Sequence, residues 1–181
     1  MRFVPTALEG LLLIEPQVYG DDRGFFLESW SAEKFAAAGL DVSFVQDNHS
    51  RSQKGVLRGM HFQNPGAQGK LVRVVSGAVY DVAVDLRRSS PTFGQWSGFE
   101  LSAENRRMLW VPRGFAHGFL TLEDDTDFLY KCDAPYAPGS EHTLAWDDPD
   151  VGIDWPLDGL DVQLAAKDRV GKCLADVETF A

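Results

Sequence analysis

The sequence has little cysteine and histidine and lacks the common cofactor motifs. Its two cysteines, Cys132 and Cys173, form no metal or redox motif, so we expect idle thiols in a reducing compartment. The four histidines are His49, His61, His117 and His142. None forms the H-x-H pair by which many β-barrels bind metal, and no G-x-G-x-x-G segment or P-loop indicates a nicotinamide or ATP site. Acid–base chemistry without a metal is favoured, and a metal site built from scattered histidines is the alternative left open.

Long apolar runs and an excess of basic residues are also absent. The longest apolar run near the N-terminus, 11–14, is too short to span a bilayer, and no signal-peptide pattern precedes it. The net charge of −10 argues against a nucleic-acid-binding or membrane-surface protein. With 181 residues, 44% of them hydrophobic, the chain predicts one globular domain over residues 1–181 in the cytoplasm.

The prevailing pattern is an alternation of apolar and polar residues with a period of two, broken by Gly and Pro turns. It predicts strands at 11–16, 24–30, 56–62, 95–101, 107–111, 118–122, 127–131 and 143–145, and a hairpin over 72–86. This spacing is typical of an antiparallel sandwich or barrel, so we expect an all-β fold. Short helices are expected only at 31–40 and 165–174.

The expected hairpin turns at Ser76-Gly77, and this turn implies a particular strand register. Lys70 and Asp81 would then project from the same face as diagonal neighbours, and Arg73 would lie opposite Tyr80. If the Lys70 face lines a barrel interior, Asp81 is the natural counter-charge of the ammonium. The alternative is a solvated surface pair that contributes about 0.2–1 kcal/mol.

The segment from Gln46 to Arg73 is locally cationic although the whole chain is acidic, because no acidic residue follows Asp47 in it. Such a cluster with His61 inside it predicts a pocket that binds an anion and moves a proton. Strict alternation places Arg58 and His61 on opposite faces of their strand, but a bulge at Gly59 would turn both into one pocket.

Three residue types here suit proton abstraction beside a ketone. A neutral histidine is a competent base near neutral pH, and a buried lysine stabilises the oxyanion that forms. Tyr130 could return a proton from elsewhere, although a core aromatic with a satisfied hydroxyl is the alternative reading.

At these residues the chain resembles the dTDP-4-dehydrorhamnose 3,5-epimerases of nucleotide-sugar metabolism. The resemblance extends from near the N-terminus to about Asp176 and rests on motifs that include GDDRGFFLESW, SFVQDNHSRSQKGVLRGMHFQ, AQGKLVRVVSGAVYDVAVDLR, WVPRGFAHGFLTLE, WDDPDVGIDWP and AKD. It implies a cupin-like jelly roll without metal or other cofactor, in a homodimer with an exchanged N-terminal strand. The segment CDAPYAPGSEH (132–142) departs most from the family pattern.

The resemblance also implies roles for individual residues. His61 matches the general base for C5 and C3 of a 4-keto sugar, Asp168 the carboxylate that orients it, Lys70 the residue that stabilises the enolate, and Tyr130 the acid on the opposite face. The matching substrate contacts are Arg23, Phe26 and Glu28 from the partner subunit, together with Gln46, Asp47, Asn48, Ser50, Arg58, His117, Glu141, Lys167 and Tyr136, whose ring stacks on thymine.

These expectations define a first hypothesis, an enzyme that converts dTDP-4-dehydro-6-deoxy-D-glucose to dTDP-4-dehydro-L-rhamnose by epimerising C3 and C5. A relative that acts on one carbon in antibiotic sugar synthesis is the second. A binding protein without catalysis, or a metal-dependent cupin, is the third.

Overall fold

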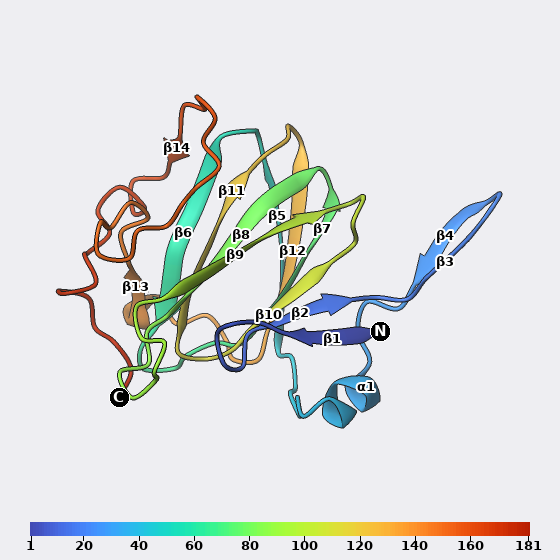
Figure 1. Ribbon diagram of the computed structural model, residues 1–181, viewed down its shortest axis with the longest axis horizontal. Coiled ribbons are helices and arrows are strands. Elements are labelled where there is room, and N and C mark those ends of the chain that lie inside the picture. Colours follow the sequence, from blue (N-terminus) through green and yellow to red (C-terminus); the bar gives the residue numbers. More distant parts are fainter.

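The computed structural model describes residues 1–181 and consists mainly of two antiparallel sheets that face one another (Figure 1). The first sheet has the order β1-β2-β10-β7-β12-β5, and the second has the order β13-β6-β11-β8-β9 with β14 along β6. The strands of the first sheet are β1 (Arg2–Pro5), β2 (Leu12–Glu15), β10 (Met108–Val111), β7 (Lys70–Ser76), β12 (Thr126–Cys132) and β5 (Gln46–Ser52). Those of the second sheet are β13 (Glu141–Thr143), β6 (Val56–Gln63), β11 (Phe115–Thr121), β8 (Ala78–Asp85), β9 (Trp96–Ser102) and β14 (Gln163–Leu164). The predicted all-β fold is confirmed.

The hairpin predicted at Ser76-Gly77 is wrong, because β7 and β8 lie in opposite sheets. β7 pairs with β10 and β12, whereas β8 pairs with β11 and β9. Gly77 carries the chain across with φ of +73°, and a Cβ at this position would collide with Thr126. The connection therefore joins the two sheets of the barrel instead of forming a β-hairpin between β7 and β8.

The register inferred from that hairpin is wrong as well. Arg73 lies opposite Met108 and Leu129 and does not face Tyr80. Lys70 and Asp81 lie on different sheets, yet both are buried, so the barrel-interior placement of Lys70 is correct and the surface alternative is excluded.

The main core fills the space between the sheets. Val72, Val74 and Leu109 from the first sheet pack with Val79 and Phe119 from the second, and all are at most 5% exposed. Period-two alternation produces this core, since every second residue of each strand points inward.

Two further clusters cover the outer faces of the sheets. Helix α1 (Ala32–Ala37), capped by Ser31, buries Phe35 against the first sheet beside Leu71 and Trp110. The C-terminal segment covers the second sheet with Trp155 and other apolar side chains. No helix is long and apolar enough to cross a membrane.

The helix predicted over 165–174 is wrong. Only the amides of Asp168 and Arg169 bond back to Ala165, and the chain continues as turns. This segment instead brings a buried carboxylate to the second sheet, as described below. The short 3₁₀ helix η1 (Pro138–Ser140) precedes β13.

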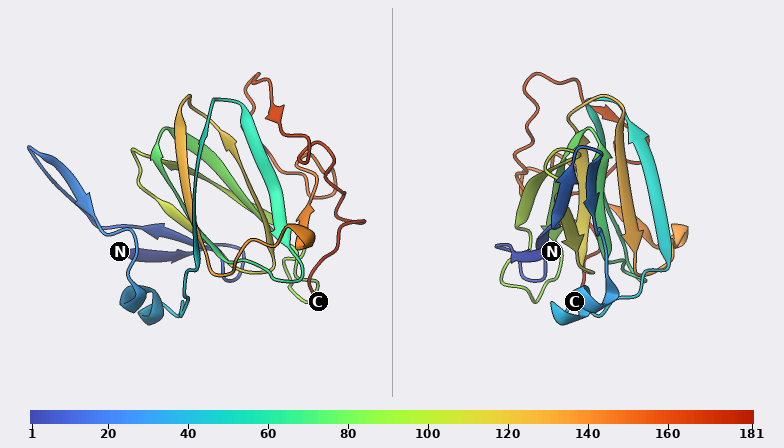
Figure 2. Two further views of the ribbon diagram at one scale, coloured as in Figure 1. Left: turned by 180° about the vertical axis from the view of Figure 1, so that it is seen from behind. Right: turned by 90° about the vertical axis from the view of Figure 1, so that its right-hand side faces the viewer.

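A hairpin of β3 (Val18–Asp21) and β4 (Gly24–Leu27) projects away from the barrel (Figures 1 and 2). Its aromatic residues Tyr19, Phe25 and Phe26 are 60–69% exposed. An extended arm with three exposed aromatic rings is unusual for the free surface of a single chain.

Candidate active site

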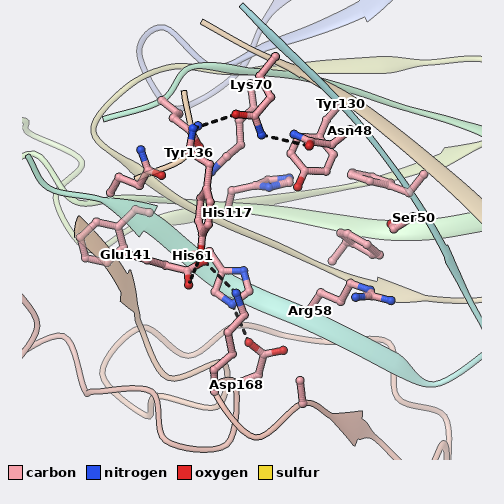
Figure 3. A pocket seen from close by; sticks show the side chains of 18 of the residues that line it. Asn48, Ser50, Arg58, His61, Lys70, His117, Tyr130, Tyr136, Glu141 and Asp168 are labelled. Carbon is pink, nitrogen blue, oxygen red and sulfur yellow. Dashed lines mark hydrogen bonds and ion pairs between the residues drawn. The ribbon is translucent and has the colours of Figure 1, made fainter. Parts of the chain in front are cut away.

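A cavity of about 390 Å³ lies inside the barrel and draws on both sheets (Figure 3). It is lined by Gln46, Asn48, His49, Ser50, Arg58, His61, Phe62, Gln63, Gln68, Lys70, His117, Phe119, Phe128, Tyr130, Tyr136, Glu141, Ala165, Lys167 and Asp168. All four predicted catalytic residues and eight of the twelve predicted binding residues are in this set. Residues more than 100 positions apart in the sequence thus meet at one site.

His61 and Asp168 form a hydrogen-bonded pair on one side of the cavity. His61 Nε2 lies 2.6 Å from Asp168 Oδ1, and the Asp168 side chain is 2% exposed whereas that of His61 is 22% exposed. An ionised carboxylate only accepts hydrogen bonds, so Nε2 carries the hydrogen and Nδ1 is left as the basic nitrogen. The geometry is that of an oriented general base.

Strand β6 turns both Arg58 and His61 into the cavity by a bulge. Arg58 lies opposite Phe119 and His61 opposite His117, so two residues of β6 face the single residue Gly118 of β11. Gly59 adopts φ of +136°, and a Cβ there would lie 2.6 Å from the Cα of Gly118. The predicted bulge at Gly59 is confirmed.

Lys70 and Tyr130 enter the cavity from the first sheet, across from His61. Burial lowers the pKa of the Lys70 ammonium, and nearby acidic groups oppose that shift. Burial raises the pKa of the Tyr130 phenol, so the hydroxyl stays protonated at neutral pH. Tyr130 and His61 thus lie on opposite walls of the cavity (Figure 3).

Deeper in the barrel, His117 is bound by a carboxylate of its own. Its Nε2 lies 2.9 Å and 3.0 Å from the two oxygens of Asp81, which is fully buried. Burial raises the pKa of Asp81, while the charges and hydrogen bond of His117 and the charge of Lys70 act in the opposite direction. Asp81 therefore pairs with His117 and not, as the sequence suggested, chiefly with Lys70.

A network of hydrogen bonds holds one part of the cavity wall. Glu141 accepts from Lys167 at 2.8 Å and from the Tyr136 hydroxyl at 3.1 Å. Burial raises the pKa of Glu141, but Lys167 outweighs that effect and the net pKa is lowered. Gln46 accepts from the Tyr136 amide and donates to Asn48 at 3.1 Å. These residues come from three distant segments and fix one another's positions.

Ser50 and Arg58 leave donors available on the wall formed by β5 and β6. The Ser50 hydroxyl is buried without a hydrogen-bond partner although it lines the cavity. Arg58 Nε donates to Ser52 at 3.1 Å, which steadies the guanidinium. This wall therefore offers hydrogen bonds and positive charge to an anionic ligand.

Four predicted binding residues do not line the cavity. Arg23 and Phe26 lie on the projecting hairpin, and Glu28 just after it bonds Lys34 at 2.7 Å. Alternation along β5 turns Asp47 outward, where it pairs with Lys131 at 2.6 Å. Arg51, on the same outer face, is bound to Asp127.

Several lining residues were missed from the sequence. Gln63 holds the loop segments around Gly66 and Ala137 through hydrogen bonds of 2.8 and 2.9 Å. Phe119 and Phe128 stack at 4.1 Å between ring centroids and give the cavity an apolar wall. Their positions in alternating strands were the available signal, but alternation does not separate cavity lining from core.

No group of three or more His, Cys, Asp or Glu side chains is placed to hold a metal ion. A two-sheet barrel that encloses a histidine–carboxylate pair, a lysine and a tyrosine defines a cupin-like jelly-roll protein with side chains suited to proton transfer. A sequence model of the dTDP-4-dehydrorhamnose 3,5-epimerases matches residues 5–176, and the chain belongs to this family.

Known relatives agree with this assignment. The chain is 55% identical to the dTDP-4-dehydrorhamnose 3,5-epimerase of Pseudomonas aeruginosa over 181 residues, 99% of each chain. A crystal structure of the 3,5-epimerase of Legionella pneumophila, in complex with dTDP-4-keto-L-rhamnose, is similar with a TM-score of 0.95 and 52% identity over 98% of this chain and 94% of the other. A 3'-monoepimerase of Streptomyces bikiniensis, in complex with dTDP-quinovose, is similar with a TM-score of 0.89 and 38% identity over 94% and 87%.

Proposed function

We propose that this protein is a dTDP-4-dehydrorhamnose 3,5-epimerase, an isomerase that converts dTDP-4-dehydro-6-deoxy-D-glucose to dTDP-4-dehydro-L-rhamnose. High identity along the full length to epimerases of this specificity supports the activity. The observation that carries the chemistry is the pair of His61 and Asp168 facing Lys70 and Tyr130 across one cavity. The cytoplasmic location expected from the sequence belongs to the same proposal.

The first half of each epimerisation is removal of a proton beside the C4 ketone. His61 Nδ1 accepts the proton from C5 or C3, the C–H electron pair forms the carbon–carbon double bond, and the carbonyl electrons move to O4. Asp168 stabilises the imidazolium through its 2.6 Å hydrogen bond. Lys70 lies on the opposite sheet with its ammonium buried, so its charge acts strongly on the O4 oxyanion.

The second half is return of a proton to the other face of the same carbon. Tyr130 projects from the first sheet and His61 from the second, so the two side chains approach a sugar between them from opposite sides. Tyr130 gives its hydroxyl proton to carbon as the enolate collapses to the ketone, and proton exchange with water restores both residues. Inversion follows because donor and acceptor are on different sheets.

We also propose that a second copy of the chain completes the nucleotide site. Arg23 and Phe26 are carried on the exposed hairpin β3–β4, away from the cavity of their own chain. An exchanged arm would bury the exposed aromatic residues and bring Arg23, Phe26 and Glu28 to the partner's cavity. Arg58 is proposed to bind the diphosphate, and Tyr136 to stack on the thymine.

A single-carbon epimerase is the second candidate. The observation that favours it is the similarity to a 3'-monoepimerase, whose fold is nearly the same. The identity of 38% is lower than the 55% and 52% to the 3,5-epimerases of Pseudomonas aeruginosa and Legionella pneumophila, which makes the single-carbon epimerase the weaker candidate.

The number of exchanged carbons decides between the two. Incubation of the enzyme with dTDP-4-dehydro-6-deoxy-D-glucose in heavy water should give a product with deuterium at both C3 and C5, detected by NMR. Uptake at one carbon would identify a monoepimerase. No uptake by folded protein would contradict epimerase activity altogether.

A further inference from the structure

The cavity contains a second histidine–carboxylate pair that the mechanism above does not use. Asp81 is on β8 and His117 on the neighbouring strand β11, and both are buried. The two Asp81 oxygens lie 2.9 and 3.0 Å from the same ring nitrogen, Nε2. A carboxylate taken fully out of water is costly unless it is paired and hydrogen-bonded, and His117 is the side chain that hydrogen-bonds Asp81 here.

This pair fixes the orientation of the His117 ring. Because Asp81 holds Nε2, the remaining nitrogen Nδ1 is left without a hydrogen-bond partner in the chain, on a side chain that lines the cavity. Phe128 lies beside the ring, 6.3 Å away between centroids and nearly parallel to it. The contact with Asp81 thus holds one ring nitrogen while the other is available to a ligand.

The surrounding charges indicate what His117 does. Asp168 is paired with His61 and Glu141 with Lys167, so Asp81 is the carboxylate available to balance a positive charge on His117. Lys70 lies on the opposite sheet and forms no ion pair with Asp81, although each influences the other's ionisation. A cationic His117 beside Lys70 would present two donors from two sheets to one oxygen atom.

We propose that Asp81 is a positioning residue that holds His117 as an imidazolium, so that Nδ1–H donates to O4 of the sugar and shares with Lys70 the stabilisation of the enolate. No proton is transferred in this step: the negative charge that reaches O4 is held by two donors until Tyr130 reprotonates carbon. The inference rests on the proposed epimerase function and adds a second donor to its oxyanion site.

A double-mutant cycle tests the proposal. His117→Gln should slow deuterium exchange at both C3 and C5 by about 100-fold, the usual cost of one oxyanion donor, with a much smaller change in KM. Asp81→Asn should slow exchange at least tenfold, and the double variant should be no slower than His117→Gln alone because Asp81 acts through His117. Exchange at the wild-type rate in Asp81→Asn, or effects that multiply in the double variant, would overturn the proposal.

A matched control is available on the same strand. Asp85 is also fully buried on β8, but it is bound by Arg87, Ser90 and Thr92 outside the cavity. Asp85→Asn should lower the melting temperature without changing kcat, which separates loss of a buried charge from loss of positioning.

NMR of the wild-type protein with ¹⁵N-labelled histidine and bound dTDP provides a second test that needs no variant. Hydrogens on both His117 ring nitrogens are expected, and a singly protonated ring would contradict the proposal. The two failures are distinguishable: wild-type enzyme without any exchange refutes the epimerase function, whereas normal exchange in Asp81→Asn refutes only the role of Asp81.

Discussion

Replacement of Asp168 by Asn tests the paired base most sharply, because it removes one charge and almost no volume. The Asp168 carboxylate is 2% exposed and lies 2.6 Å from His61 Nε2. Two opposite unit charges about 4 Å apart interact by about 4 kcal/mol at an effective dielectric constant of about 20. The His61 side chain is 22% exposed, so water reduces this stabilisation of the imidazolium to roughly 2–3 kcal/mol.

A loss of that size corresponds to about 30- to 160-fold in rate. The asparagine adds a second effect, because its amide can donate to Nε2 and move the hydrogen of the neutral ring to Nδ1, the nitrogen that has to accept the proton. We therefore expect kcat for deuterium exchange to fall by at least about 100-fold, with little change in the affinity for dTDP.

The control for this substitution is Asp148→Asn. Asp148 is also 2% exposed and accepts from the amides of Asp150, Val151 and Leu174, away from the cavity. Asp148→Asn should lower the melting temperature and leave kcat per folded molecule unchanged. Wild-type exchange rates in folded Asp168→Asn would refute the assignment of the carboxylate.

Three further predictions concern the acid, the diphosphate site and the pH dependence of stability. Tyr130→Phe should reduce product formation more than proton removal, so that substrate recovered from heavy water carries deuterium; an equal loss of both would revise the order of events. Arg58→Ala should weaken dTDP binding by about 1.5–3 kcal/mol, or roughly 10- to 150-fold, in calorimetric titration, because it removes a charged donor, and an unchanged affinity would count against that role. Hydrogen bonds from Arg87, Ser90 and Thr92 outweigh burial and lower the pKa of Asp85 from 3.8 to about 2. This depressed pKa contributes about 2 kcal/mol of stability above pH 4 that is lost as the pH falls toward 2, so the difference in unfolding free energy between wild type and Asp85→Asn should narrow over that range.

Local rules predicted the strands well but not their partners. The alternation of apolar residues in β6, β7, β8, β11 and β12 was sufficient to locate these strands. It could not decide that Ser76-Gly77 crosses between sheets, because a two-residue turn and a crossing have the same local sequence. β5 was missed because its sequence, QDNHSRS, has no apolar residue to mark a strand.

Local sequence patterns predicted only the site residues that are close together in the sequence. Arg58, His61 and Lys70 are close in sequence, so a pocket could be inferred from composition, and Gly59 indicated the bulge. Asp168 lies in turns where a helix was expected, and only the family resemblance joined it to His61. The pair of Asp81 and His117 depends on two strands meeting in register, which no local pattern encodes.

In the proposed mechanism a single histidine, His61, removes the proton at both carbons. The most direct test is to incubate His61→Asn with dTDP-4-dehydro-6-deoxy-D-glucose in heavy water, follow C3 and C5 by NMR, and measure dTDP affinity on the same sample. We expect exchange to disappear at both carbons while dTDP binding stays close to that of the wild type. Exchange that persists at either carbon in this variant would contradict this mechanism.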